Sequence, residues 1–310
     1  MQPFRILSID GGGIRGIVPA IVLERLSQSL PGWLDDVGLV AGTSSGGLLA
    51  LALARGLEPR EIRTFYEEKG PRIFADSWID DIRDIGKLLG AQYDSAALLR
   101  ELKTIFGNTT LGDLDKRVLV ASFDLDGHSR DPRKRMWKPK LFHNFAGRDS
   151  DRRERAYKVG AYTCAAPTYF PSVDGFIDGG VYANNPSMCA LAQSQDRRSV
   201  KPTPKMKDVV LLSLGTGTPL KFIRGKSLDW GYLKWAGPII DIMMEGVSGI
   251  ADYQCAKILG KNYHRLAPVL EPGQVIRMDA HGRLSELVSF AESVDLRKTV
   301  RWLRERWDGE

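Results

Sequence analysis

The chain has 310 residues, of which 43% are hydrophobic and 26% charged, with a formal net charge of +6. This is the composition of a globular protein with a sizeable core, it excludes wholesale disorder, and no stretch approaches the roughly 18 uncharged apolar residues of a membrane-spanning helix. The three cysteines lack CxxC spacing, which argues against a disulfide framework and a cysteine zinc site, so we expect no metal and no cofactor.

Short apolar runs alternate with stretches of helical periodicity along the chain. Residues 4–9 predict a buried strand, which is followed by apolar residues at helical spacing, and a second strand at 37–41 leads into an apolar helix at 48–54. Buried strands that alternate with helices predict a parallel sheet covered on both faces. We therefore expect a single α/β domain over residues 1–310, a three-layer α/β/α sandwich with a central, mostly parallel sheet. Further strands are expected at 118–123, 176–177, 209–214 and 275–278, and a helix at 288–307.

The first candidate site follows the first strand, where Asp10 precedes the sequence Gly-Gly-Gly-Ile-Arg-Gly at 11–16. Glycines at a strand-to-helix junction let several backbone N–H groups point at one place beside the positive end of a helix dipole. Such a loop holds an anion, either a bound phosphate or the oxyanion of an acyl-transfer reaction.

The same loop fits the dinucleotide fingerprint, with Gly11, Gly13 and Gly16 at the required spacing. The fingerprint also needs an acidic residue at the end of the second strand, and that strand ends instead in Ala-Gly-Thr-Ser at 41–44. A nucleotide- or phosphate-binding module that uses the loop at 11–16 is therefore the alternative function.

The second candidate site follows the second strand. Gly-Thr-Ser-Ser-Gly at 42–46 matches the G-x-S-x-G nucleophile elbow, in which small residues permit a sharp turn that exposes the serine hydroxyl. The next backbone N–H can then contribute to an oxyanion hole. Ser44 is the candidate nucleophile, and Ser45 is the rival, one position away from the centre of the motif.

The third candidate site is the carboxylate of Asp178, which ends the short apolar strand at 176–177 and precedes Gly179 and Gly180. A lone Asp-Gly pair is usually an ordinary turn, so its interpretation depends on the other two sites. An anion-binding loop, a hydroxyl and a carboxylate at three strand ends are what a hydrolase needs at one edge of a parallel sheet.

In this order the three motifs resemble those of the patatin-like phospholipases. The resemblance rests on the motifs at 11–16, 42–46 and 178–180, and it extends to Ala-Ala-Pro-Thr-Tyr-Phe-Pro at 165–171, Asn-Asn-Pro at 184–186 and Ser-Leu-Gly-Thr-Gly at 213–217. It implies a patatin-like fold and a lipid acyl hydrolase of the phospholipase A or lysophospholipase type. Such an enzyme cleaves acyl esters through a Ser–Asp dyad and an acyl-enzyme.

The resemblance also implies a role for individual residues. Ser44 would be the nucleophile and Asp178 the base that takes its proton, and Arg15 would bind substrate. A carboxylate is a weaker base than imidazole, so burial that raises the pKa of Asp178 would improve it. The oxyanion hole would be lined by the backbone N–H groups of Gly11, Gly12 and Gly13.

A histidine-dependent mechanism stays open at this point. The chain order serine, aspartate, histidine is that of an α/β-hydrolase esterase, which would use Ser44, Asp178 and either His264 or His281. Both histidines lie in polar stretches typical of a protein surface, and replacing each by alanine distinguishes the two mechanisms.

The basic excess is local. Residues 130–158 contain eleven basic and four acidic residues, so this segment carries +7 and the rest of the chain −1. We interpret it as a basic insertion at the active-site edge, where its cations and Trp137 would meet anionic lipid headgroups, with a solvated insertion as the alternative. The cations expected to meet the headgroups together with Trp137 are Arg133, Lys134, Arg135 and Lys138.

Residues 228–245 combine tryptophans with an apolar run, which indicates either buried core or a lid or membrane-facing segment. The expected partners are a phospholipid or other acyl-lipid substrate and, peripherally, an anionic membrane, without nucleic acid. The N-terminus has none of the features of a secretory signal peptide, which predicts a cytoplasmic protein.

Overall fold

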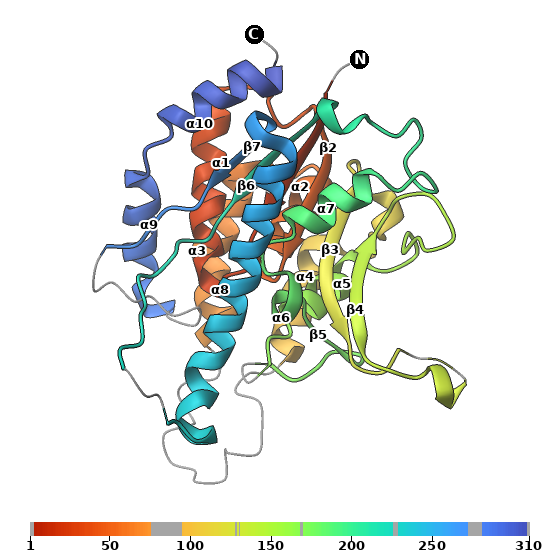
Figure 1. Cartoon of the computed structure of the whole chain (residues 1–310), viewed down its shortest axis with the longest axis vertical. Coiled ribbons are helices and arrows are strands. Elements are labelled where there is room, and N and C mark those ends of the chain that lie inside the picture. Colours follow the sequence, from red (N-terminus) through yellow and green to blue (C-terminus); the bar gives the residue numbers. More distant parts are fainter. Residues whose placement is uncertain are drawn as a thin grey trace.

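The computed structural model describes residues 3–75, 95–127, 129, 131–167, 170–225, 229–271 and 281–308. Within them, one sheet of seven strands is flanked by helices (Figure 1). The strands are β1 (Phe4–Ile9), β2 (Val37–Thr43), β3 (Val118–Asp124), β4 (Lys138–His143), β5 (Phe176–Asp178), β6 (Val209–Leu214) and β7 (Tyr263–Leu266). The α-helices are α1 (Ile17–Ser29), α2 (Ser45–Ala54), α3 (Pro59–Ala75), α4 (Ser95–Phe106), α5 (Ala156–Cys164), α6 (Gly180–Ala183), α7 (Ser187–Ser194), α8 (Tyr232–Leu259), α9 (Leu284–Ser293) and α10 (Arg297–Trp302).

The sheet is mostly parallel and has the strand order β4-β3-β2-β1-β6-β7. β1 pairs in parallel with both β2 and β6, β2 also pairs in parallel with β3, and β6 also pairs in parallel with β7. β4 and β5 are both antiparallel to β3. Because parallel strands share a direction, the carboxyl ends of β1, β2, β3 and β6 meet at one edge of the sheet. We call this the C-terminal edge, and it is the lower edge of the sheet in Figure 1.

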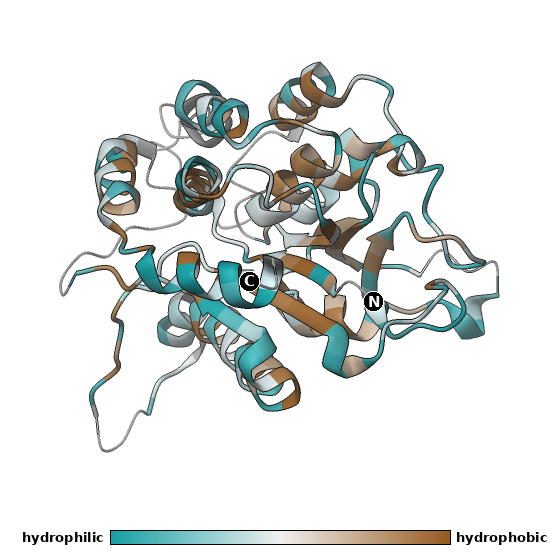
Figure 2. Cartoon of the chain, turned by 90° about the horizontal axis from the view of Figure 1, so that it is seen from above, coloured by the Kyte–Doolittle hydropathy of each residue, from teal (hydrophilic) through white to brown (hydrophobic). Residues whose placement is uncertain are grey.

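Both faces of the sheet are covered, which explains why its central strands are continuous apolar runs. Successive strand residues point to opposite faces. Leu7 and Val40 lie in a core shared with α1, α2 and α5, and their neighbours Ile6 and Leu39 lie in a second core shared with α7 and α8. Figure 2 shows apolar colour in the central strands and helices whose two sides differ in hydropathy. The predicted α/β sandwich with a mostly parallel sheet is confirmed.

Two strands and one helix boundary differ from the expectations. β4 lies within the basic segment at 130–158, so part of that segment is an edge strand of the sheet. β7 was not expected, and the predicted strand at 275–278 lies outside the described residues. The expected C-terminal helix at 288–307 is interrupted at Val294, after which α10 and a π-helical turn (Leu303–Asp308) follow.

The segment at 228–245 lies at the surface where the structure describes its side chains. It contains the start of α8, on which Ile239, Ile242 and Met243 are exposed. Trp235 is half-buried, and its ring packs against that of Trp230 with 5.1 Å between the centroids. The core interpretation is therefore wrong for the exposed side chains of this helix.

Candidate active site

Ser44 occupies a strained turn between β2 and α2. Its backbone has φ 54° and ψ −129°, a left-handed conformation that is unfavourable for a residue with a side chain. The turn is tight because a Cβ on Gly46 would overlap the carbonyl oxygen of Ile9, and one on Gly42 would overlap that of Gly46. The backbone N–H of Ser44 donates to Oγ1 of Thr163 at 2.8 Å, which fixes the turn against α5. This is the geometry of a nucleophile elbow.

The structure brings Asp178 to Ser44. Asp178 ends β5 with only 3% of its surface exposed, and its Oδ1 accepts a hydrogen bond from the Gly180 N–H at 2.7 Å. Burial raises the pKa of the Asp178 carboxyl to about 6, although hydrogen bonds from the Ser44 side chain and the Gly180 N–H oppose that rise. A buried hydroxyl thus contacts a carboxyl group that is a stronger base than an ordinary aspartate.

The glycine loop passes directly beside Ser44, since a Cβ on Gly11 would lie 3.1 Å from the Ser44 Cβ. Its amides are used differently from the expectation. The Gly11 N–H donates to the carbonyl oxygen of Asn184 at 3.0 Å, and the Gly12 N–H donates to Oγ of Ser45 at 3.1 Å. These two amides are therefore engaged within the protein. In the described part of the chain, the N–H groups of Gly13 and Ser45 donate to no protein acceptor.

Arg15 is buried and holds two loops together. Its Nη1 donates to the carbonyl oxygen of Gly217 at 2.8 Å, so it links the glycine loop to the loop after β6. Thr216 in the same loop donates from Oγ1 to the Gly11 carbonyl at 3.0 Å. This environment indicates that Arg15 positions the glycine loop, whereas the resemblance implied a substrate-binding residue.

A buried ion pair that the sequence did not reveal supports the start of the glycine loop. Arg265 on β7 donates to both carboxylate oxygens of Asp10, at 3.2 and 2.6 Å, and to Oγ of Ser213 at 2.7 Å. Burial raises the pKa of Asp10 even though the Arg265 charge opposes the rise. The sequence could have revealed this ion pair only through a prediction of β7, and the mostly polar sequence of that strand does not predict one.

Asn184 and Cys164 also border the pair of Ser44 and Asp178. Nδ2 of Asn184 donates to Oγ of Ser248 on α8 at 3.0 Å, and its Oδ1 lies close to the Gly11 backbone. Burial and the charge of Asp178 raise the pKa of the Cys164 thiol well above its ordinary value, and a hydrogen bond with the Ser44 side chain opposes that rise.

His264 has a structural environment. Its Nε2 lies 2.9 Å from Oγ1 of Thr299, and its ring stacks on Trp302 with 5.3 Å between the centroids. His143 is buried at the end of the sheet opposite the C-terminal edge, with its ring against that of Phe145. The side chains of His128 and His281 lie outside the part of the chain that the structure describes. No histidine side chain that the structure describes bonds to Ser44 or Asp178.

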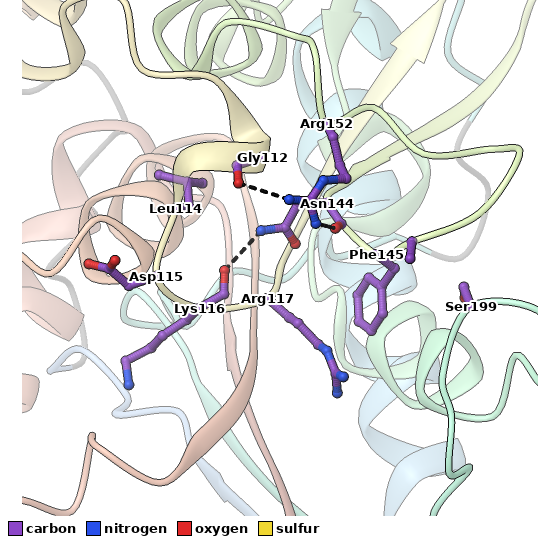
Figure 3. Close-up of a pocket in the computed structure, with 10 residues that line it drawn as sticks. Gly112, Leu114, Asp115, Lys116, Arg117, Asn144, Phe145, Arg152 and Ser199 are labelled. Atoms are coloured by element: carbon purple, nitrogen blue, oxygen red, sulfur yellow. Dashed lines mark hydrogen bonds between the residues drawn. The ribbon is translucent and has the colours of Figure 1, made fainter.

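A cavity of about 260 Å³ lies at the opposite edge of the sheet from Ser44. Its polar side chains bond to nearby backbone: Nδ2 of Asn144 donates to the Lys116 carbonyl, and Arg152 donates to the carbonyls of Gly112 and Asn144 (Figure 3). These bonds join the segment between α4 and β3 to the segment between β4 and α5. Over the described residues, no group of three His, Cys, Asp or Glu side chains is arranged to bind a metal ion, and no helix is long and apolar enough to span a membrane.

Comparisons with known proteins show which proteins this chain resembles. The family model described as "Patatin-like phospholipase" matches residues 7–191. The chain is 33% identical to a cGAMP-activated phospholipase of Pseudomonas aeruginosa, over 91% of this chain and 83% of that protein. It is 30% identical to patatin-like protein 2 of Arabidopsis thaliana, over 82% of this chain and 71% of the relative. It is also 29% identical to patatin-2-Kuras 4 of Solanum tuberosum, over 95% of this chain and 87% of the relative.

Proposed function

Since the chain belongs to the patatin-like phospholipase family of serine hydrolases, which are lipid acyl hydrolases, we propose that it cleaves acyl esters with Ser44 as nucleophile and Asp178 as base. The observation that carries this proposal is the contact between the Ser44 hydroxyl and the buried Asp178 carboxyl, directly beside the glycine loop.

In the first step Oγ of Ser44 attacks the ester carbonyl carbon and its proton passes to Asp178. A hydroxyl is a weak nucleophile until an adjacent base removes that proton, and a carboxyl with a pKa of about 6 is mostly ionised near neutral pH. When the tetrahedral intermediate collapses, the leaving alcohol takes the proton from Asp178. Water then attacks the acyl-enzyme and Asp178 accepts a proton from that water. As the second tetrahedral intermediate collapses, Asp178 returns this proton to Oγ of Ser44, and the fatty acid is released.

The oxyanion of each tetrahedral intermediate needs fixed donors. The N–H groups of Gly13 and Ser45 are the candidates, because they have no protein acceptor in the described residues and Ser45 begins α2, at the positive end of that helix dipole. Gly12 contributes by holding the Ser45 side chain in place. Removal of one oxyanion donor in a serine protease costs about 2.7–4 kcal/mol, so a weak carboxylate base can suffice when two such donors are present.

The substrate class is a phospholipid, lysophospholipid or other acyl lipid, which the protein would meet at a lipid surface. Two features disfavour the nucleotide-binding alternative. The amides of Gly11 and Gly12 are engaged within the protein, and the loop lies against a nucleophile elbow.

Two assays test the proposal. A fluorophosphonate probe should label the wild-type protein and His264→Ala but not Ser44→Ala, and the products formed from a panel of defined phospholipids and lysophospholipids should identify the ester that is cleaved. Ser44→Ala and Asp178→Asn should release no fatty acid. Hydrolysis by Ser44→Ala at the wild-type rate would refute the assignment of the nucleophile.

A further inference from the structure

The hairpin that joins β3 and β4 ends in two exposed apolar side chains. Asp124 at the end of β3 pairs with Lys138 at the start of β4, so the connection extends beyond the C-terminal edge of the sheet, where Ser44 also lies (Figure 1). In it, Met136 is 64% exposed and Trp137 70% exposed. We refer to residues 131–138 as the hairpin tip. Packing in the core does not account for its apolar side chains.

Cations surround this apolar pair. The two arginines of the hairpin tip form ion pairs with Asp131 and Asp126. Lys134 and Lys138 are exposed, and neither pairs with an acidic side chain of the described residues. The hairpin tip thus combines a tryptophan and a methionine with positive charges that are not neutralised locally.

A second set of exposed apolar side chains lies at the same end of the molecule. The chain leaves β6 at the C-terminal edge and carries Phe222, which is 74% exposed and has the Arg224 guanidinium 5.0 Å from its ring centroid. In Figure 1, the first turns of α8 lie at the lower end of the molecule, to the left of the hairpin tip. The members of this second apolar set are Leu220, Phe222, Ile223, Ile239, Ile242 and Met243.

α8 connects the second apolar set to the candidate active site. Two residues beyond Ile242, Met244 packs against Gly180, where a Cβ would lie 3.1 Å from the methionine Cε. A further turn along, Oγ of Ser248 accepts the hydrogen bond from Asn184. The helix that carries the exposed side chains therefore has a fixed position relative to Ser44 and Asp178.

The chemistry of these two projections fits one kind of partner. Tryptophan and other large apolar side chains insert at the interface of a bilayer, and lysine and arginine beside them are attracted to anionic lipid headgroups. The two sets project at separate points of one end of the molecule, and a bilayer is broad enough to touch both at once. A small peptide segment would reach only one of them.

We propose, building on the proposed lipid hydrolysis, that the hairpin tip and the second apolar set together form a docking face for anionic lipid bilayers. Docking through this face places the C-terminal edge of the sheet, with Ser44, toward the headgroups. Substrate is then taken from the bilayer to which the protein is bound.

Vesicle binding by the full chain tests this proposal. Ser44→Ala is the background, so that no lipid is consumed. Co-sedimentation is measured with vesicles of phosphatidylcholine alone and of phosphatidylcholine mixed with phosphatidylglycerol. We expect tight binding only to the anionic vesicles, weakened by salt. A Met136→Ser/Trp137→Ala variant should bind about tenfold or more weakly, and Lys134→Ala/Lys138→Ala should lower the affinity for anionic vesicles by a similar factor.

Matched controls come from the opposite end of the sheet. Met206 and Lys207 are also exposed, and they directly precede β6. Met206→Ser and Lys207→Ala should leave the vesicle affinity unchanged. Equal binding by the hairpin-tip and control variants would overturn the proposal, as would binding independent of anionic lipid.

Activity on two substrates separates this proposal from the proposed function. With Ser44 present, the hairpin-tip variants should cleave a soluble short-chain ester at the wild-type rate and vesicle phospholipid at least about tenfold more slowly. Equal loss on both substrates would contradict docking. Absence of ester cleavage by the wild type would refute the hydrolase alone, because the vesicle-binding result does not depend on Ser44.

Discussion

At the scale of the residue, the buried carboxyl group of Asp178 has two effects. Its raised pKa makes it a better base than an exposed aspartate, and the same burial destabilises its ionised form in the folded protein. Its neighbours provide few compensating charges, since its hydrogen bonds come from a hydroxyl and a backbone N–H. The burial of Asp178 therefore favours catalysis by raising the pKa of its carboxyl group, and it lowers the stability of the folded protein when that group is ionised.

The first prediction concerns the pH dependence of the reaction. Asp178 must be ionised to accept the Ser44 proton, and its pKa is about 6. We expect kcat/KM for a soluble ester to be constant at neutral pH and to fall about tenfold per pH unit below the pKa. A pH–rate profile checks this. A rate that stays constant well below the pKa would contradict a role for Asp178 as base.

The second prediction concerns stability. The pKa of Asp178 is raised in the folded state, so the stability that its protonated form contributes is complete below the unfolded value of 3.8 and is lost as the pH rises through about 6. We expect Asp178→Asn to increase the free energy of unfolding by ~1–3 kcal/mol at about pH 8, and to have little effect at about pH 4. Urea denaturation at both pH values measures the difference. Destabilisation at the higher pH would show that the ionised carboxylate is needed for folding.

The third prediction distinguishes the two mechanisms that the sequence left open. His264 contacts Thr299 and Trp302, so we expect His264→Ala to destabilise the fold by roughly 1–2 kcal/mol and to retain ester hydrolysis within about twofold. Thermal unfolding and a soluble-ester assay measure the two effects. Near-complete loss of hydrolysis in a folded variant would favour the serine–histidine–aspartate mechanism.

At the scale of the element, the structure depends on close approaches between strand ends. β1, β2 and β5 deliver the glycine loop, Ser44 and Asp178 to one place, and the backbone at Gly42 and Gly46 has no room for a side chain. β1 and β2 could be predicted because their residues are buried on both faces, which leaves long apolar runs in the sequence, whereas β5 has only two apolar residues, both partly buried. The three motifs could be predicted because each lies at the carboxyl end of one of these strands.

β4 and β7 could not be predicted, because edge strands are partly exposed and tolerate polar residues. β4 begins with Lys138, Pro139 and Lys140, and β7 contains His264 and Arg265. Without β7 nothing in the sequence links Arg265 to Asp10, 255 positions away. The hydrogen bond from the Gly11 N–H to the Asn184 carbonyl could not be predicted either, because it depends on how a loop distant in the sequence packs.

The fourth prediction compares glycines in two helices. Gly46→Ala should remove hydrolysis and destabilise the fold, since its Cβ would overlap the backbone of β1. Gly249 on α8 has no atom within 4 Å of its Cβ position, so Gly249→Ala should stabilise the protein by ~0.5–1 kcal/mol with hydrolysis unchanged. Chemical denaturation and the soluble-ester assay compare them. Normal activity in Gly46→Ala would show that the elbow can relax.

At the scale of the whole molecule, the π-helical turn at Leu303–Asp308 packs against the start of β1. Trp307 is completely buried, its Nε1 donates to the Trp33 carbonyl at 3.0 Å, and its own carbonyl accepts from Nε of Arg5 at 2.7 Å. Residues 302 positions apart thus share one hydrogen bond, at the end of the sheet opposite Ser44.

The fifth prediction follows from that contact. Trp307→Ala leaves a large cavity and removes a buried hydrogen bond, so we expect it to lower the free energy of unfolding by ~3–5 kcal/mol. Trp302→Ala, at a half-buried position in the same region, should cost less. Thermal unfolding of the two variants measures the difference, and equal losses would contradict the role of Trp307 in joining the chain ends.

The meeting of the first strand and the last turn also determines how the protein can be handled. Figure 1 shows both termini at the upper end of the molecule, away from the hairpin tip and the start of α8. An affinity tag, a fluorescent partner or a linkage to a sensor chip at either terminus would leave the lower end unobstructed. A chip coated in this way would present an oriented layer of enzyme to liposomes flowing over it.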